Sequence, residues 1–236
     1  METIVCYKAD SGREVWTQQI ESRFEDSLGG PGPRATPTLA GDAMFVMGAS
    51  GPLIRPDPRS GDIIWTQDLR EVADREPPIW GFCSSPLVID SLVIVHAGGK
   101  GDKGTLAFDI ETGHLRWSAA AGDHSYSSPQ SCTIAGADLV LMLTNTGINL
   151  LDPQTGQEQL NYEWKHEGYR SLQPQVVDAN SILLPTGMGA GTRRIRILKD
   201  GDGWSAEAMW TSLHLKPDFN DFVVSQGYAY ISSHYV

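Results

Sequence analysis

Short apolar runs alternate with polar, glycine-containing turns along the whole chain. Four of these runs, each of four or five residues rich in Val, Ile and Leu, are residues 43–47, 92–95, 139–143 and 181–184. They are continuous rather than alternating, which is typical of strands covered on both faces. Helical periodicity is nearly absent; only residues 21–28 and 68–75, in the longer connections 17–33 and 66–80, are expected to form one helical turn each. The pattern predicts an all-β protein.

A turn motif returns in step with these runs. It consists of an acidic or small residue, a Ser-Gly or Thr-Gly pair, and an apolar segment that ends in tryptophan, or in leucine in the fourth copy: Trp16, Trp65, Trp117 and Leu160. The glycines of these turns are Gly12, Gly61, Gly113 and Gly156. Their spacings of 49, 52 and 43 residues match one four-stranded propeller blade. A fifth copy, between Lys199 and Trp210, is degenerate.

A second marker recurs in register with the first, namely Thr36-Pro37, Ser85-Pro86, Ser128-Pro129 and Gln173-Pro174. Each repeat then holds four strands: one after the proline, one after a polar turn, one leading into the glycine turn, and one carrying the tryptophan. Whole blades are therefore expected at 34–70, 84–121, 127–165 and 172–212. Residues 1–20 would supply the last two strands of a blade, and 219–236 the first two strands of a further one.

The glycine turn joins the last two strands of each repeat, because glycine accepts a positive φ at no steric cost. We interpret Trp16, Trp65 and Trp117 as structural. A tryptophan on an outermost strand can bury ~150–250 Å² against the neighbouring blade, and its indole N–H can bond that blade's backbone. Ligand stacking on these rings is the alternative.

Composition narrows the choice of partners. The chain of 236 residues has 29 acidic and 18 basic side chains, a net charge of −11, so it would repel a polyanion and nucleic acid is not an expected partner. Cys6, Cys83 and Cys132 are far apart and are expected to be small buried hydrophobes, without a zinc or disulfide framework. The first residues lack a signal-peptide pattern, and no run approaches the roughly 18 apolar residues of a membrane helix, so no transmembrane segment is expected.

The Asp-x-x-[Ser/Thr]-Gly-x-x-x-Trp motif, with a Ser-Pro before each first strand, resembles the pyrroloquinoline-quinone-like β-propeller repeat family over essentially the whole chain. Relatives of this kind include quinoprotein alcohol dehydrogenases and the non-catalytic propeller lipoprotein of the bacterial outer-membrane assembly machinery. They are usually eight-bladed and exported. The resemblance therefore implies part of an eight-bladed ring and a periplasmic or other extracytoplasmic location, but it does not distinguish catalyst from scaffold.

Closure of the ring has two solutions. The end segments 1–20 and 219–236 could pair into one composite blade and close five blades, or the chain could form an incomplete arc of an eight-bladed ring. Five blades would need a larger wedge angle and repacking of every interface. We therefore expect an open arc whose two end segments lie apart.

The dehydrogenase site of this family does not map onto the chain. The resemblance implies adjacent cysteines beneath the quinone and a Ca²⁺ ion held by Glu, Asn and Asp, and neither pattern is present. The segment 200–203, Asp-Gly-Asp-Gly, is interpreted as a hairpin turn, with an ion site as the alternative. The glycine-rich segment 186–194 is interpreted as an inter-strand turn, because a phosphate loop must open a helix; an anion cradle is the alternative.

Candidate binding residues lie in the segments that enter the first strand of each blade, because these segments reach the mouth of the central channel. They are Trp80, His124, Tyr126, Tyr169, Arg170, Asp218 and Asn220. Aromatic walls with a few polar tips are typical of a ligand or peptide site, and Arg170 is expected to offer a carboxylate or a quinone oxygen a bidentate partner. The alternative is that these residues only satisfy the edges of the blades.

The leading functional hypothesis is a non-catalytic propeller that acts as a binding or scaffolding module for a protein or small molecule, with no cofactor. The second hypothesis is a quinone-dependent dehydrogenase of alcohols or sugars, using pyrroloquinoline quinone and Ca²⁺, whose catalytic residues lie outside this chain. A hydrolase is a third class, supported only by the position of His124.

Overall fold

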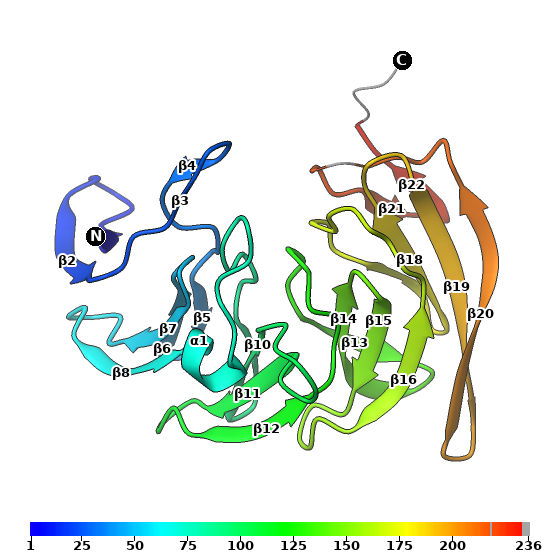
Figure 1. Cartoon of the computed structure of the whole chain (residues 1–236), viewed down its shortest axis with the longest axis horizontal. Coiled ribbons are helices and arrows are strands. Elements are labelled where there is room, and N and C mark those ends of the chain that lie inside the picture. The colour runs from blue at the N-terminus through cyan, green and yellow to red at the C-terminus, as the bar shows by residue number, and fades with distance from the viewer. Residues whose placement is uncertain (218, 233–236) are drawn as a thin grey trace.

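The computed structural model describes residues 1–217 and 219–232, which form an open arc of antiparallel sheets (Figure 1). Blade I consists of β5 (Thr38–Ala40), β6 (Ala43–Met47), β7 (Pro52–Pro56) and β8 (Ile63–Asp68). Blade II consists of β9 (Leu87–Ile89), β10 (Leu92–His96), β11 (Thr105–Asp109) and β12 (Leu115–Ala119). Blade III consists of β13 (Gln130–Ile134), β14 (Ala137–Thr144), β15 (Gly147–Leu151) and β16 (Glu158–Glu163). Blade IV consists of β17 (Gln175–Asp178), β18 (Ser181–Thr186), β19 (Gly191–Asp200) and β20 (Gly203–Ser212).

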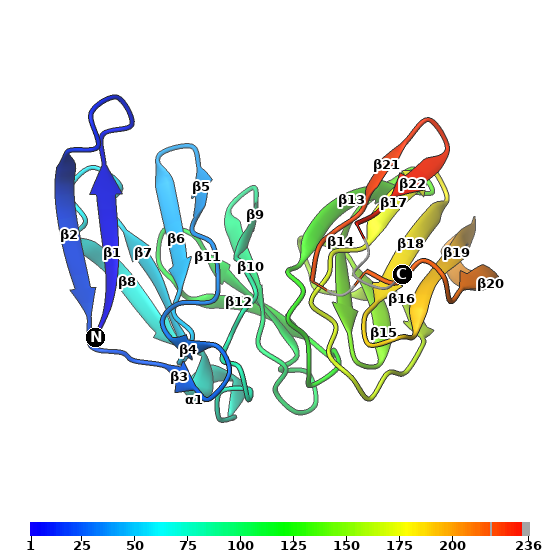
Figure 2. The same cartoon turned by 90° about the horizontal axis from the view of Figure 1, so that it is seen from above.

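A two-stranded hairpin lies at each end of the arc. The N-terminal hairpin is β1 (Glu2–Tyr7) with β2 (Glu14–Ile20), and the C-terminal hairpin is β21 (Val223–Ser225) with β22 (Tyr228–Tyr230). They belong to separate sheets, and two perpendicular views place them at opposite ends of the molecule (Figures 1 and 2). The end segments therefore lie apart, as the sequence predicted.

Each buried run faces two neighbours at once, which explains why it does not alternate. In β10, Val93 packs in a cluster shared with blade I, whereas Ile94 packs in a cluster shared with blade III. Two more clusters lie between blades III and IV and between the N-terminal hairpin and blade I. The core is thus a series of apolar layers between consecutive sheets.

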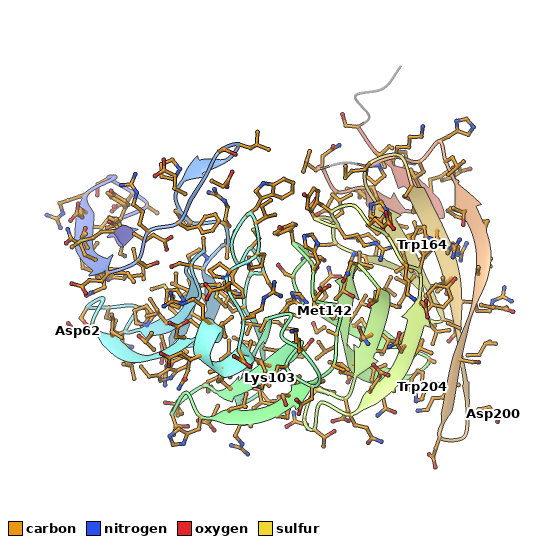
Figure 3. The ribbon with its side chains drawn as sticks, viewed as in Figure 1. Asp62, Lys103, Met142, Trp164, Asp200 and Trp204 are labelled. Atoms are coloured by element: carbon orange, nitrogen blue, oxygen red, sulfur yellow. The ribbon has the colours of Figure 1, made fainter. Side chains whose placement is uncertain are left out.

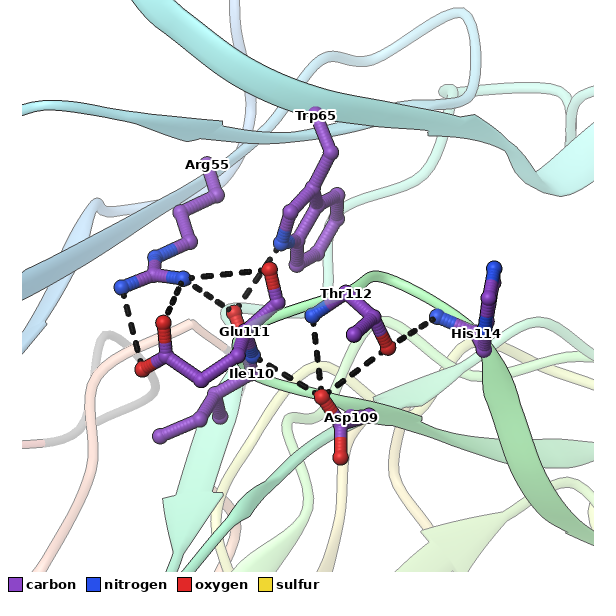
Figure 4. A network of polar contacts seen from close by, with 7 residues as sticks. All are labelled: Arg55, Trp65, Asp109, Ile110, Glu111, Thr112 and His114. Atoms are coloured by element: carbon purple, nitrogen blue, oxygen red, sulfur yellow. Dashed lines mark hydrogen bonds and ion pairs between the residues drawn. The ribbon is translucent and has the colours of Figure 1, made fainter.

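The repeat tryptophans connect neighbouring blades. Trp65 Nε1 donates to the carbonyl of Ile110 in blade II at 3.0 Å, and Arg55 Nη1 donates to the same oxygen at 2.8 Å and to Glu111 Oε2 at 2.7 Å (Figure 4). A Cβ on Gly113 would meet the Trp65 ring at 2.8 Å, so only glycine fits under the indole. We call this arrangement the tryptophan lock.

The lock occurs at two further interfaces. Trp16 Nε1 donates to the carbonyl of Pro58, and Trp117 Nε1 donates to that of Pro153, each at 3.1 Å. Gly61 and Gly156 lie under these rings, where a Cβ would come within 2.6 and 2.5 Å. These contacts support the structural interpretation of the tryptophans.

The second marker also links blades. The backbone N–H of Thr36 donates to Ser85 Oγ at 3.0 Å, and the N–H of Ser85 donates to Ser128 Oγ at 2.9 Å. Further round the arc, the N–H of Gln173 donates to Asp221 Oδ1 at 3.0 Å. A side chain of one blade thus accepts the amide of the preceding blade, which explains why both markers keep the same period.

The interface between blades III and IV is built differently. Leu160 stands in the tryptophan place, and β19 and β20 have ten residues each, with their turn at Asp200 (Figure 3). Trp164, also labelled in Figure 3, lies between two guanidinium groups, with Arg193 at 4.5 Å and Arg170 at 5.1 Å from its ring. These cation–π contacts add to the apolar packing of Leu160 at this interface.

One of the two expected helical turns forms. Helix α1 (Leu69–Ala73) begins after Asp68, whose carboxylate accepts the N–H of Arg70, and ends at Asp74 with φ 51°. The other expectation is wrong: residues 21–28 contain β3 (Glu25–Asp26), paired with β4 (Gly30–Pro31), because Asp26 Oδ1 accepts two amides in a tight turn.

Two further sequence expectations concern cysteines and membranes. Cys6 lies on β1, Cys132 on β13 and Cys83 in the connection between blades I and II. All three are free thiols that are partly rather than fully buried. No helix in residues 1–217 and 219–232 is long and apolar enough to cross a membrane.

Candidate functional site

Four of the predicted mouth residues meet in space although they come from three different connections. The ring centroids of Trp80 and Tyr169 are 4.0 Å apart, those of Trp80 and Tyr126 are 5.3 Å apart, and His124 meets Tyr126 edge-on at 4.8 Å. The separations of Tyr126 from Trp80 and from His124 are typical of favourable aromatic pairs, and the Trp80–Tyr169 contact is closer. We call Trp80, His124, Tyr126 and Tyr169 the mouth cluster. It joins the connections between blades I and II, II and III, and III and IV.

Backbone contacts hold the cluster in place. The N–H of Asn145 donates to the His124 carbonyl at 2.8 Å, while the N–H of His124 donates to Asn145 Oδ1 at 3.3 Å. The N–H of Tyr126 donates to the Arg170 carbonyl at 2.9 Å. Loops tied at both backbone groups present their rings in a fixed arrangement, which reduces the entropy that binding would cost.

The cluster carries little charge. Tyr126 is buried, and burial raises the pKa of its phenol to about 12. The Trp80 backbone lowers that pKa by a smaller amount, but the contact lacks hydrogen-bond geometry, and Tyr126 Oη has no partner among the described residues. Burial also lowers the pKa of His124, with Asp123 opposing the shift, so the imidazole is neutral at pH 7.

Sequence reasoning missed Arg75, which follows the C-terminal end of α1 and supports the cluster from there. Its Nη1 donates to the carbonyls of Gly98 and Asp123, each at 2.6 Å, and so joins blade II to the loop that carries His124. Burial lowers the pKa of Arg75, and Asp123 partly offsets this shift. No repeat signal marks this residue, because it follows a helix that, among the described residues, occurs in one connection only.

Arg170 corrects one prediction. The side chain is 1% exposed, and its guanidinium donates to the carbonyls of Thr144 and Trp164 and to Thr186 Oγ1. Burial, and then the nearby Arg193, lower its pKa to about 10. Arg170 is therefore a structural clamp rather than a cation offered to a ligand.

Asn220 and Asp218 are the remaining candidates. Asn220 donates to the Ser232 carbonyl at 2.5 Å, within the C-terminal segment. Asp218 lies outside the described residues. The segment 200–203 is the turn of the β19–β20 hairpin, and 187–190 connects β18 to β19 directly, with no helix after it. Both turn interpretations are confirmed.

Two features of the described residues bear on a calcium–quinone cofactor. No group of three or more His, Cys, Asp or Glu side chains in residues 1–217 and 219–232 is placed to hold a metal ion. The three cysteines are separate free thiols. At the mouth, the ring of Trp80 packs against the ring of Tyr169, a residue of the same chain.

Four-stranded blades joined by tryptophan locks define a β-propeller of the quinoprotein-like repeat class. The family described as outer membrane protein assembly factor BamB matches residues 1–184, and the chain belongs to this family. No curated protein matches the sequence.

Solved structures agree on the fold. BamB from Moraxella catarrhalis aligns over 94% of this chain and 61% of its own, with 18% identity and a TM-score of 0.60. The C-terminal WD40 domain of Sif2 aligns over 88% and 58%, with 10% identity and a TM-score of 0.58. Quinohemoprotein alcohol dehydrogenase from Comamonas testosteroni aligns over 92% and 42%, with 16% identity and a TM-score of 0.51. The chain spans less than two thirds of each of these proteins.

Proposed function

We propose that this chain is a non-catalytic propeller that binds a protein partner through the mouth cluster and acts in assembly outside the cytoplasm. The observation that carries the proposal is the cluster itself, four rings from three connections, in which backbone hydrogen bonds hold the segment of His124 and Tyr126. Trp80, His124 and Tyr169 remain partly exposed around the buried Tyr126. Rigid aromatic groups of this kind are enriched among the residues that dominate protein interfaces.

The family name supports a protein partner and an extracytoplasmic site of action, because it describes an outer membrane assembly factor. The local chemistry agrees with this choice. The rings have a large apolar area and polar edges, which suits the recognition of a partner.

The test compares mouth variants in partner binding. Trp80→Ala and Tyr169→Ala remove partly exposed rings, while His114→Ala changes an exposed residue in the glycine turn of blade II and serves as the matched control. A partner captured with the wild-type chain is identified by mass spectrometry, purified, and titrated against each variant by calorimetry. We expect each mouth variant to weaken binding by roughly tenfold or more, and the control to bind normally. Equal affinity for all variants would contradict the proposal.

The dehydrogenase hypothesis has its own test. Pyrroloquinoline quinone and Ca²⁺ are added to the chain, and dye reduction with alcohols and sugars is followed. Reconstituted turnover would replace the binding proposal with a catalytic one, and we expect none.

A further inference from the structure

One buried register position changes character along the arc. It belongs to the third strand of each blade and lies one place before the residue that pairs with the tryptophan or leucine of the lock position. Ile54 holds it in blade I, Leu106 in blade II and Asn149 in blade III. Ile54 is 1% exposed, Leu106 0% and Asn149 2%. Blade III thus buries an amide where the first two blades bury an aliphatic side chain, and a buried polar group is costly unless it is bonded.

Two interfaces between blades fill the space in front of this position. Between blades I and II, Leu106 packs in one apolar cluster with Leu69, which follows the lock position of blade I by four residues. Between blades III and IV, Arg193 holds the same register position. Its guanidinium lies 4.5 Å from the ring of Trp164, which likewise follows the lock position of blade III by four residues. One interface therefore uses an aliphatic pair, and the other uses a guanidinium on a ring.

The interface between blades II and III leaves this space open. The corresponding residues are Ala121, four residues after Trp117, and Asn149, and both side chains are short. A cavity of about 270 Å³ is lined by residues 120–122 of blade II and by Asn149, Asn161 and Glu163 of blade III. The cavity lies where the next interface holds the side chain of Arg193.

Glu158 determines how the two amides of the cavity are turned. Nδ2 of Asn149 donates to Glu158 Oε2 at 2.6 Å, and Nδ2 of Asn161 donates to the same oxygen at 3.4 Å. Each Oδ1 therefore remains an acceptor, and neither accepts a hydrogen bond from another described residue. The Glu163 carboxylate adds two acceptor oxygens, one of which is bonded to Lys165 at 2.7 Å. The lining thus requires a ligand rich in hydrogen-bond donors.

We propose that this cavity binds a guanidinium group supplied by another molecule. A guanidinium offers five N–H donors in one plane and stays charged, so it suits two amide oxygens and a carboxylate. The net charge of −11 attracts a cation to the chain. The volume is below the roughly 300 Å³ of the smallest drug-sized sites, so the cavity takes one functional group. The rings of the mouth cluster do not line it, so the proposal stands independently of that cluster.

Soluble probes test the proposal on the full chain labelled with ¹⁵N. N-acetylarginine amide represents an arginine side chain of a protein, and agmatine represents a free guanidinium compound. N-acetylcitrulline amide has the same shape as the arginine probe without its charge, and N-acetyllysine amide carries an ammonium instead. We expect both guanidinium probes to shift the side-chain amide resonances of Asn149 and Asn161, the lysine probe to bind more weakly, and the citrulline probe not to bind. The tighter of the two guanidinium probes identifies the source of the group.

Three substitutions are expected to act with different signs. Asn149→Leu restores the residue type of blade II, so the chain is expected to fold and to bind the arginine probe at least roughly tenfold more weakly. Glu163→Gln removes a carboxylate that is 65% exposed, and is expected to weaken binding by about two- to fivefold. Lys165→Gln removes the cation that competes for Glu163, so it is expected to strengthen binding by a similar factor.

Matched controls separate the cavity from the general charge of the chain. Glu207→Gln and Arg196→Gln each break an exposed ion pair of blade IV, and both variants are expected to bind the probe like the wild type. Asn180→Leu changes an exposed amide in a turn of that blade and is the control for Asn149→Leu. Circular dichroism verifies that each variant is folded.

Several results would overturn the proposal. One is an arginine probe that leaves both asparagine resonances unchanged. Others are equal binding of the citrulline or lysine probe, and equal binding of the arginine probe by Asn149→Leu and the wild type. If the ion-pair controls changed the affinity as much as Glu163→Gln and Lys165→Gln, the attraction would belong to the whole surface rather than to the cavity.

Discussion

Trp117 Nε1 in blade II lies 3.1 Å from the carbonyl oxygen of Pro153 in blade III. The corresponding carbonyl under Trp65, that of Ile110, accepts a second hydrogen bond from Arg55 at 2.8 Å. The two locks thus have the same geometry but different numbers of donors. This difference makes the contribution of the indole N–H measurable.

Substitution by phenylalanine keeps a ring and removes the N–H. We expect Trp117→Phe to lower the free energy of unfolding by about 1–2 kcal/mol, because the Pro153 carbonyl loses its donor. Trp65→Phe is expected to cost about half as much, since Arg55 still satisfies Ile110. Urea unfolding followed by circular dichroism measures both values. A larger loss for Trp65→Phe than for Trp117→Phe would contradict this account.

The turn glycines separate backbone strain from steric overlap. Gly113 (φ +71°) and Gly136 (φ +75°) need the same left-handed backbone, but only Gly113 lies under an indole, with a Cβ position 2.8 Å from Trp65. Gly136→Ala is expected to cost about 1 kcal/mol, from backbone strain alone. Gly113→Ala is expected to cost about 2 kcal/mol more, because the ring must move. Equal losses in urea unfolding would show that the indole adapts freely.

The buried Arg170 is expected to be a major contributor to stability. Arg170→Met keeps the aliphatic stem but leaves the carbonyls of Thr144 and Trp164 without their donor, a loss of about 3 kcal/mol. Arg196→Met, at an arginine in an exposed ion pair with Glu207, is the control and is expected to cost less than about 1 kcal/mol. Thermal and urea unfolding compare the two variants. Similar losses of unfolding free energy in Arg170→Met and Arg196→Met would contradict the clamp role of Arg170.

His96 predicts a pH dependence. Its ring is buried, Nε2 lies 2.8 Å from the Gly122 carbonyl, and burial lowers its pKa from 6.5 to about 4. The folded state binds fewer protons than the unfolded chain, so the contribution of His96 is complete above pH 6.5 and is lost as the pH falls towards 4. The slope contributed by this residue is at most about 1.4 kcal/mol per pH unit.

His96→Gln tests this prediction, because glutamine can donate to Gly122 without titrating. The free energy of unfolding is measured by urea titration from pH 7 to about 5.5, above most of the range in which ordinary carboxylates lose their charge. The pKa values of His124 and His166 are also lowered by burial, so part of the slope is expected to remain. If the unfolding free energy of His96→Gln depended on pH as steeply as that of the wild type, the pH dependence would belong to groups other than His96.

Local signals predicted the blades well. The continuous run 92–95 indicated a strand covered on both faces, and Val93 and Ile94 do pack against opposite neighbours. The turn glycine predicted the hairpin beneath each tryptophan, because a positive φ and a close approach leave only glycine at that position. The members of the mouth cluster could also be predicted, because Trp80, His124 and Tyr169 lie in segments that precede first strands and the fold brings those segments together.

The sequence by itself determined the repeat, the four-stranded blades and the role of the tryptophans, because these depend on residues close together in the chain. Only the tertiary structure decided that Arg170 is buried as a clamp, since three separate segments surround its guanidinium. It also decided that Trp210 occupies the register position of Trp65, opposite an arginine and beside a bulge, because the longer β19–β20 hairpin shifts the spacing along the chain while the register is kept. Burial and register arise from packing between segments that are distant in sequence, and spacing along the chain does not encode them.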